Sequence, residues 1–200
     1  MIESLPKLRS SPQGILLAAG LGRRFDPAGQ RDKLLQPLAD GRPLLWHSAR
    51  HLCTALPGSI AVIRPDQTAR RNVLEDACCT VLVSAAAEEG MGTALASAVV
   101  ASYDANGWLV ALGDMPWLEP ALIREVVVAL DRPDVVAAPY HQGKRGHPVA
   151  FGRAWGAQLA QLVGDTGART LLQTADIRRV ACATADILRD VDLPADLDRG

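Results

Sequence analysis

The sequence predicts an α/β fold in which a mostly parallel central sheet lies between two layers of helices. Two observations lead to this prediction: short, unbroken apolar runs recur along the chain, and stretches with helical periodicity lie between them. A short apolar run suits a strand that is buried on both faces, as strands of parallel sheets are. Strands and helices that alternate in this way pack as right-handed crossover units, so successive strands point in the same direction.

Six stretches are predicted to be strands. The first is the apolar run at residues 14–19, which ends in glycine. The others lie at residues 60–63, 81–83, 108–112, 135–138 and around 179–183. In an open sheet of this kind, ligands bind beyond the carboxyl ends of the strands. We therefore expect functional residues directly after these runs.

The predicted helices fill the intervals between the strands. One apolar face is formed by Leu44, Leu45, Ser48, Leu52 and Leu56. The remaining helices are expected from a cap at Asp66 to about Cys78, from Thr93 to Tyr103, from Pro120 to about Leu130, and over 168–174 with Asp165 as the cap.

Length and composition suit one globular domain. The chain has 200 residues, of which 48% are hydrophobic and 22% are charged, and a domain of this size can bury a sizeable core. We expect residues 1–12 to form a flexible leader and residues 13–200 to form a single domain. The sequence has no repeat and no low-complexity segment that would divide it.

The charge and the cysteines exclude several classes of protein. The formal net charge of −1 gives no overall attraction to nucleic acid or to an anionic membrane. The first residues lack the apolar region of a secretory signal, and no run approaches the roughly 18 residues of a membrane span. The four cysteines have no metal-ligand spacing and are interpreted as reduced thiols. We expect a cytoplasmic protein.

A glycine-rich turn follows the first predicted strand. Its residues run from Leu17 to Phe25 and include Gly20 and Gly22, so the backbone can approach a ligand closely and point its amides at phosphate oxygens. Phe25 replaces the third glycine of a dinucleotide-binding fingerprint, and no Walker A lysine follows. Arg24 and Lys33 would hold a triphosphate. The alternative is a tight strand–helix turn with two solvated bases.

Five blocks resemble the nucleotidyltransferases that make sugar nucleotides and molybdopterin dinucleotides. The turn reads Leu-Ala-Ala-Gly-x-Gly-x-Arg with a lysine further on. Gly113-Asp114-Met115-Pro116 follows the fourth strand, where that family keeps its metal-binding aspartate. The remaining blocks are similar to the cytidylyltransferase of molybdenum cofactor maturation; they are residues 143–149, 164–169 and 190–197. The chain departs from that pattern at Asp26, which replaces a common glycine, and at Leu193, which replaces a frequent threonine.

The resemblance implies a nucleotide-diphospho-sugar transferase-like fold, a Rossmann-like three-layer sandwich, and a Mg²⁺-dependent reaction. Arg24, Lys33 and Asp114 would be catalytic. Asp114 and Asp192 would hold the metal, with Asp190 as the alternative second ligand. The implied nucleotide-binding residues are Leu17, Ala18, Ala19, Gly20, Gly22, Arg24, Lys33, Gly92, Thr93 and Asp114.

The resemblance also implies the two substrates. CTP would donate CMP to the phosphate of molybdopterin, which Arg145 and His147 would bind. A molybdenum hydroxylase or its maturation factor would be a transient partner, whereas nucleic acid and membranes would not be partners. Two alternatives stay open. One is a guanylyl- or other nucleotidyltransferase of the same fold, and the other is a non-catalytic molybdopterin carrier, which would have no need of the triphosphate-binding bases.

Overall fold

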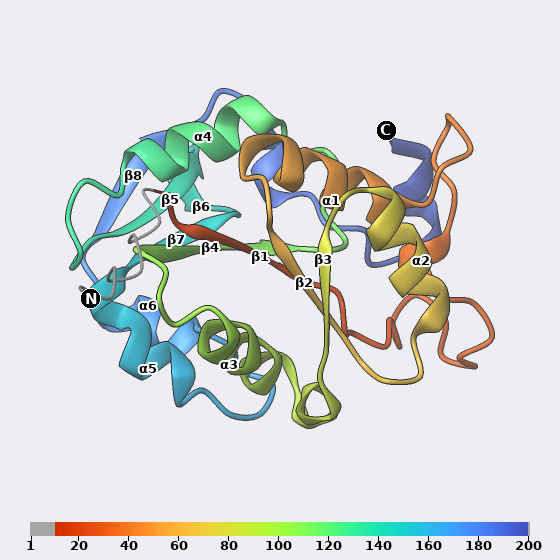
Figure 1. Cartoon of the computed structure of the whole chain (residues 1–200). Coiled ribbons are helices and arrows are strands. Elements are labelled where there is room, and N and C mark those ends of the chain that lie inside the picture. Colours follow the sequence, from red (N-terminus) through yellow and green to blue (C-terminus); the bar gives the residue numbers. More distant parts are fainter. Residues whose placement is uncertain (1–10, 200) are drawn as a thin grey trace.

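The computed structural model describes residues 11–199. Most of the expected leader, residues 1–10, lies outside the described residues. From residue 13 onward the described chain forms alternating strands and helices around one mixed sheet (Figure 1).

The sheet has eight strands and is mostly parallel, as the sequence predicts. Its order is β3-β2-β1-β4-β7-β5-β6, and β8 pairs with β5. β1, β2, β3 and β4 pair in parallel, and so do β5 and β8, whereas β7 and β6 are antiparallel to their neighbours. The strands are β1 Gln13–Leu17, β2 Ile60–Ile63, β3 Thr80–Val83, β4 Gly107–Leu112, β5 Val136–His141, β6 Lys144–Arg145, β7 Val149–Gly152 and β8 Ile177–Ala181.

Helices cover both faces of the sheet and complete the three layers. One layer contains α1, α2 and α4, and the other contains α3, α5 and α6 (Figure 1). The helices are α1 Leu44–Ala55, α2 Thr68–Asp76, α3 Met91–Ala101, α4 Pro120–Val128, α5 Gly156–Ala160 and α6 Arg169–Thr174. This arrangement confirms the predicted fold class.

Each face of the sheet has its own hydrophobic core. Leu16 and Leu109 of the sheet pack with α1, α2 and α4 on one side. Ile15 and Trp108 point to the other side and pack with α3, α5 and α6. Neighbouring residues of one strand alternate between the faces, and both faces are buried here. The strands therefore appear in the sequence as unbroken apolar runs.

Several helix boundaries differ from those predicted. α2 begins at Thr68 after Gln67, and α6 begins after Ala168, so neither Asp66 nor Asp165 is a cap. α3 begins at Met91 after Gly90, two residues before the expected Thr93. The differences amount to a few residues, and the terminal turns of helices are the parts whose boundaries are least sharply defined.

The antiparallel strands β6 and β7, which both pair with β5, are absent from the sequence-based prediction. β7 lies between β4 and β5, and Trp108 pairs with Phe151 across the β4–β7 ladder. β8 begins at Ile177, two residues before the expected position. The segment between β6 and β7 carries His147, one of the predicted acceptor-binding residues.

The cysteines are free thiols in the structure. The Sγ atoms of Cys53 and Cys79 lie 3.1 Å apart in the core, and Cys78 is exposed. Contact with Cys53 and burial raise the pKa of the Cys79 thiol far above its usual range. Within residues 11–199, no helix has both the length and the apolar character needed to cross a membrane.

Candidate active site

The carboxyl ends of β1, β2 and β4 meet at one edge of the sheet. Leu17 pairs with Val62 of β2 and with Leu112 of β4. One step beyond the strands, the amide of Gly113 donates a hydrogen bond to the carbonyl of Leu17 at 2.9 Å. The glycine-rich turn after β1 and Asp114 after β4 therefore lie at the same edge, where open parallel sheets bind ligands.

Small residues shape the turn after β1. Gly22 has a φ of +64°, and a side chain there would place its Cβ only 3.0 Å from the Cβ of Lys33. Gly20 is exposed and has open space where a Cβ would be. The carbonyl of Ala19 accepts a hydrogen bond from Nε of Arg64 at 2.8 Å. The backbone of the turn is thus accessible from one side and fixed from the other.

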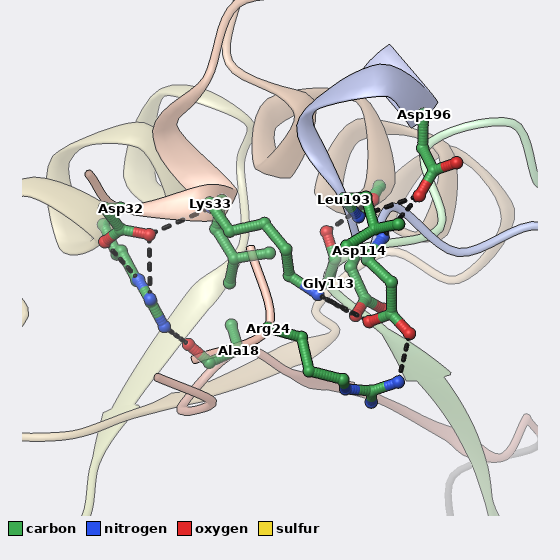
Figure 2. Close-up of polar contacts among 12 residues, drawn as sticks. Ala18, Arg24, Asp32, Lys33, Gly113, Asp114, Leu193 and Asp196 are labelled. Carbon is green, nitrogen blue, oxygen red and sulfur yellow. Dashed lines mark hydrogen bonds and ion pairs between the residues drawn. The ribbon is translucent and has the colours of Figure 1, made fainter. Parts of the chain in front are cut away.

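Lys33 reaches the end of β4 from a short helix, η1 (Lys33–Leu35). Asp32 caps this helix by accepting a hydrogen bond from the amide of Leu34 at 2.9 Å. Lys33 is only 8% exposed, and its Nζ lies 2.7 Å from Oδ2 of Asp114 (Figure 2). A buried ammonium needs such a charged partner. The structure therefore brings the two predicted catalytic residues into direct contact.

The C-terminal segment returns to the same place. The amide of Val191 donates to the carbonyl of Asp114 at 3.0 Å, and the Val191 side chain is buried in the core. The carboxylate of Asp196 accepts hydrogen bonds from the amides of Asp192 and Leu193 at 3.1 and 2.8 Å (Figure 2). This segment is held at the site by its backbone, so the acidic side chains on either side of Val191 are placed beside Asp114.

Two cations and three carboxylates gather at this point. Carboxylate oxygens of Asp114, Asp190 and Asp192 lie within 4.8 Å of one another. Asp192 forms an ion pair with Arg24, and its Oδ1 is 3.7 Å from Nζ of Lys33. Burial and the negative charges of Asp192 and Asp114 raise the pKa of Asp190. Both candidates for the second metal ligand are therefore brought to Asp114.

This donor set fits a hard divalent cation. Mg²⁺ is held in proteins by carboxylate oxygens together with water and substrate phosphates. The cluster offers one oxygen from each of three carboxylates, and no nitrogen or sulfur ligand of the described residues belongs to it. Such a set favours magnesium or manganese over zinc.

A cavity of about 360 Å³ opens between the turn and the start of α3. Asp114 and Lys33 lie in its wall, as do other residues that the resemblance marks as nucleotide-binding: Leu17, Ala19, Gly20 and Gly22. Ala18 and Arg24 are not among the lining residues; Ala18 is buried, and Arg24 points to Asp192 (Figure 2).

Gly92 and Thr93 occupy a different place from the one expected. The amide of Gly92 donates to the carbonyl of Gly164 at 2.7 Å, and Oγ1 of Thr93 accepts from the amide of Gly164 at 3.1 Å. Neither residue lines the cavity, whereas their neighbours Gly90 and Met91 do. The two residues join α3 to the loop around Gly164 because the first turn of the helix packs against that loop.

A second cavity of about 390 Å³ adjoins the first. Leu17, Met91, Leu112 and Asp165 belong to the walls of both cavities. Arg145 and His147 line the second cavity, together with Arg169 and an apolar floor that includes Phe151 and Leu172. The structure thus brings Arg145 and His147 to a separate space beside the first cavity.

Backbone contacts fix His147 in this wall. Its amide donates to the carbonyl of Ile187 at 3.0 Å. The preceding Gly146 has no room for a side chain, since a Cβ would lie 2.3 Å from the same carbonyl oxygen. Nδ1 of His147 is buried and has no hydrogen-bond partner among the described residues. Burial lowers the pKa of His147 to about 4, so its imidazole is neutral at neutral pH.

Sequence reasoning missed several residues of these cavities. Arg64, Glu88 and Asp165 all line the first cavity. Arg64 directly follows β2, so its position at the carboxyl end of a predicted strand is a signal that could have identified it. Asp165 was interpreted as a helix cap, and only the packing of its loop against Gly90 brings it to the cavity.

Comparison with known proteins identifies the type of domain. The family model for the MobA-like NTP transferase domain matches residues 14–180. Rv0371c from Mycobacterium tuberculosis H37Rv has a similar structure, with 26% sequence identity and a TM-score of 0.81 over 94% of this chain and 96% of that chain. No curated protein sequence matches this chain.

Two further solved structures share the fold. A structure of Rv0371C in complex with manganese is 24% identical, with a TM-score of 0.78 over 95% of this chain and 97% of that chain. A nucleotidyl transferase from Methanothermobacter thermautotroptrophicus (Mth528) is 20% identical, with a TM-score of 0.79 over 95% of each chain.

The environment of His147 leads to a titration experiment. The His147 signals in a proton NMR titration, assigned by their loss in His147→Gln, should have a midpoint near the pKa of about 4. The unfolded chain binds this proton more tightly than the folded protein. The histidine's contribution to the free energy of unfolding is therefore complete above about pH 6.5 and lost as pH falls towards 4. A midpoint at or above 6.5 would show that the ring is solvated.

Proposed function

This chain belongs to the family of MobA-like NTP transferase domains, and from that premise we propose that it transfers CMP from CTP to the phosphate of molybdopterin. Pyrophosphate would be released, and the product would be molybdopterin cytosine dinucleotide. The observation that carries this proposal is the position of Asp114. It lies in the wall of the first cavity, beside Lys33, where a second cavity with its own basic residues adjoins.

The first cavity suits the nucleotide. Its wall combines the accessible backbone of Gly20 with the buried ammonium of Lys33. Arg24 is held nearby by its ion pair with Asp192. Backbone amides and fixed cations bind triphosphates and stabilise the charge that develops on departing pyrophosphate. Arg24 and Lys33 would provide this stabilisation.

The reaction needs no general base from the protein. The attacking group is a phosphate oxygen of the acceptor, and a phosphate monoester is largely dianionic at neutral pH because its second pKa is about 6. The oxygen forms a bond to the α-phosphorus of the nucleotide while the bond to the pyrophosphate oxygen breaks. Catalysis then consists of holding two anions in line and stabilising their charge. A site made of Asp, Lys and Arg suits that task.

Asp114 and Asp192 would hold Mg²⁺, with Asp190 beside them. When bound, Mg²⁺ supplies positive charge to the phosphate oxygens and orients them. The manganese complex of Rv0371C supports a divalent metal in this fold. The oxygen-only donor set of this chain supports it independently.

The second cavity suits an acceptor that has an anionic end and an apolar body. Arg145 and Arg169 supply positive charge at its wall, while Phe151 and Leu172 supply apolar surface. Neutral His147 lies in the same wall and adds no charge of its own at neutral pH. These features support molybdopterin, which combines a ring system with a phosphate. A molybdenum hydroxylase or its maturation factor would receive the product.

Two other functions are distinguishable by simple assays. A guanylyltransferase of the same fold would use GTP, and the Leu-Ala-Ala-Gly reading of the turn, with Ala19, favours the cytidylyl form. A molybdopterin carrier would release no pyrophosphate. The contact of Lys33 with Asp114, in the wall of a cavity that the glycine-rich turn also lines, favours a catalytic enzyme over a molybdopterin carrier.

The proposed function predicts turnover with a clear order of nucleotides. Purified protein supplied with Mg²⁺ and molybdenum-loaded molybdopterin should release pyrophosphate with CTP, and more slowly with GTP, ATP or UTP. A preference for GTP would replace the cytidylyl assignment with the guanylyl one. Absence of pyrophosphate release with all four nucleotides would favour the carrier.

Asp114→Asn should remove most of the metal-dependent turnover. Loss of one charge-stabilising group at a reacting phosphate typically costs about 10²–10³ in rate. The control is Asp104→Asn, an exposed carboxyl beyond α3, which should leave kcat unchanged. Thermal unfolding of both variants reports whether the fold is retained. Near-normal kcat of Asp114→Asn at saturating Mg²⁺ would exclude it as the principal ligand.

Ala19→Gly should relax the selectivity for CTP without inverting it. Ala19 is 6% exposed and lines the first cavity at the end of β1, so its methyl group occupies space that a purine would need. Small changes in pocket shape usually alter discrimination by about 10–200-fold. The measurement is the ratio of kcat/KM for CTP and GTP in both proteins. An unchanged ratio would place the base elsewhere.

A further inference from the structure

Arg70 is a buried cation that neither cavity includes. It lies on α2, is 3% exposed, and forms a two-pronged ion pair with Asp32: Nε is 2.7 Å from Oδ2, and Nη2 is 2.8 Å from Oδ1. Its third nitrogen, Nη1, donates to the carbonyl of Ala18. The guanidinium therefore joins the end of β1 to the residue before Lys33.

Asp32 transmits this contact to Lys33. Besides pairing with Arg70, its Oδ1 caps η1 through the amide of Leu34 at 2.9 Å, and its carbonyl accepts from Nε2 of Gln36 at 2.8 Å. Figure 2 shows Asp32 on one side of Lys33 and Asp114 on the other. These contacts tie the backbone at the start of η1, from which the Lys33 side chain extends, to the guanidinium of Arg70.

The energetic cost of the pair argues for a positioning role. Removing a guanidinium from water is expensive, and a buried ion pair is often no more stabilising than apolar residues of the same volume. What a two-pronged pair does supply is a fixed relative orientation. Here the pair fixes the position of the Ala18 backbone, at the start of the glycine-rich turn, relative to the helix that starts with Lys33.

We propose that Arg70 and Asp32 are positioning residues, which hold Lys33 and the glycine-rich turn in the register that binds the phosphates. Neither residue lines either of the two cavities. The proposal rests on the phosphate-binding role given above to Lys33, and it is independent of which base or acceptor the enzyme uses. A misplacement of about 1 Å at a reacting centre can cost about 10²-fold in rate.

Conservative variants test the geometry. Asp32→Asn keeps the shape of the side chain and its capping oxygen but removes the ion pair. Arg70→Lys keeps the positive charge but removes the planar guanidinium that binds both carboxylate oxygens. Each should lower kcat by about 10–100-fold at temperatures well below its unfolding midpoint. Arg71→Lys, an exposed neighbour on the same helix, is the matched control and should behave as wild type. Wild-type kcat in Asp32→Asn would overturn the proposal.

A double-mutant cycle separates positioning from a general structural effect. The probe is magnesium tripolyphosphate, whose binding is measured by calorimetry and needs neither a base nor an acceptor. Asp32→Asn should weaken binding about 10-fold in the wild-type background and have no further effect in Lys33→Met, because residues that act through one another are non-additive. Equal weakening in both backgrounds would show that Asp32 acts independently of Lys33.

Failure of the positioning proposal can be distinguished from failure of the proposed function. If the protein does not turn over CTP with molybdopterin, tripolyphosphate binding still reports on Lys33 and Asp32. If Arg70→Lys does not fold, Asp32→Asn carries the test, since Asp32 is partly solvated and the amide oxygen of the variant can still accept a hydrogen bond from the buried Arg70 guanidinium.

Discussion

Three carboxylates whose oxygens lie within 4.8 Å of one another repel each other, and nearby positive charge offsets this repulsion. At an effective dielectric constant of about 20, two such charges about 5 Å apart repel by roughly 3 kcal/mol. Lys33 and Arg24 provide the balance, Lys33 through Asp114 and Asp192 and Arg24 through Asp192. Burial and repulsion raise the pKa of Asp190, the one carboxylate of the three with no ion pair to a cation among the described residues. This balance of charge at the end of β4 is the condition that the surrounding structure must satisfy.

The fold meets this condition by bringing three distant segments to one edge of the sheet. The loop after β1 carries the cations, Gly113-Asp114 extends β4, and residues 190–192 return from the C-terminal part of the chain. Each segment is fixed through its backbone: Gly113 to Leu17, and Val191 to Asp114. The charged side chains can therefore be close together without carrying the stability of the fold, which the two apolar cores provide.

The parts of the site that sequence reasoning could predict are those set by the strand pattern. Asp114 follows an apolar run and a glycine, and parallel strands place all such residues at one edge, so its position was predictable. The fold class followed from the same runs. The second acidic ligand came from resemblance, and the structure brings both candidates, Asp190 and Asp192, to the same cluster.

The parts that could not be predicted depend on contacts between segments far apart in the sequence. Gly92 and Thr93 look like the start of a helix facing a ligand, but the loop at Gly164 occupies their polar groups. Arg70 looks like any charged residue on the surface of α2, and its partner Asp32 is 38 positions away. The return strand β7 is only four residues long, and it pairs with β4 and β5 and not with its neighbour in sequence, β6. In all three cases the local pattern is ordinary and the partner decides the role.

The chemistry proposed for the site explains why supporting contacts matter as much as the groups that touch substrate. An acceptor phosphate is already nucleophilic, so the enzyme gains little from a proton-abstracting residue and much from the placement of charge. In the proposed reaction two anions would approach each other at Asp114, where Lys33 and Arg24 would offset the local repulsion although the whole chain has a net charge of −1. Flexible lysine and arginine side chains do this only when their backbones are fixed, because loose cations would relax towards solvent instead of towards the reacting phosphates. The buried contacts of Arg70 with Asp32 and Ala18 fix the backbone on one side of the site, and the contact of Val191 with Asp114 fixes it on the other.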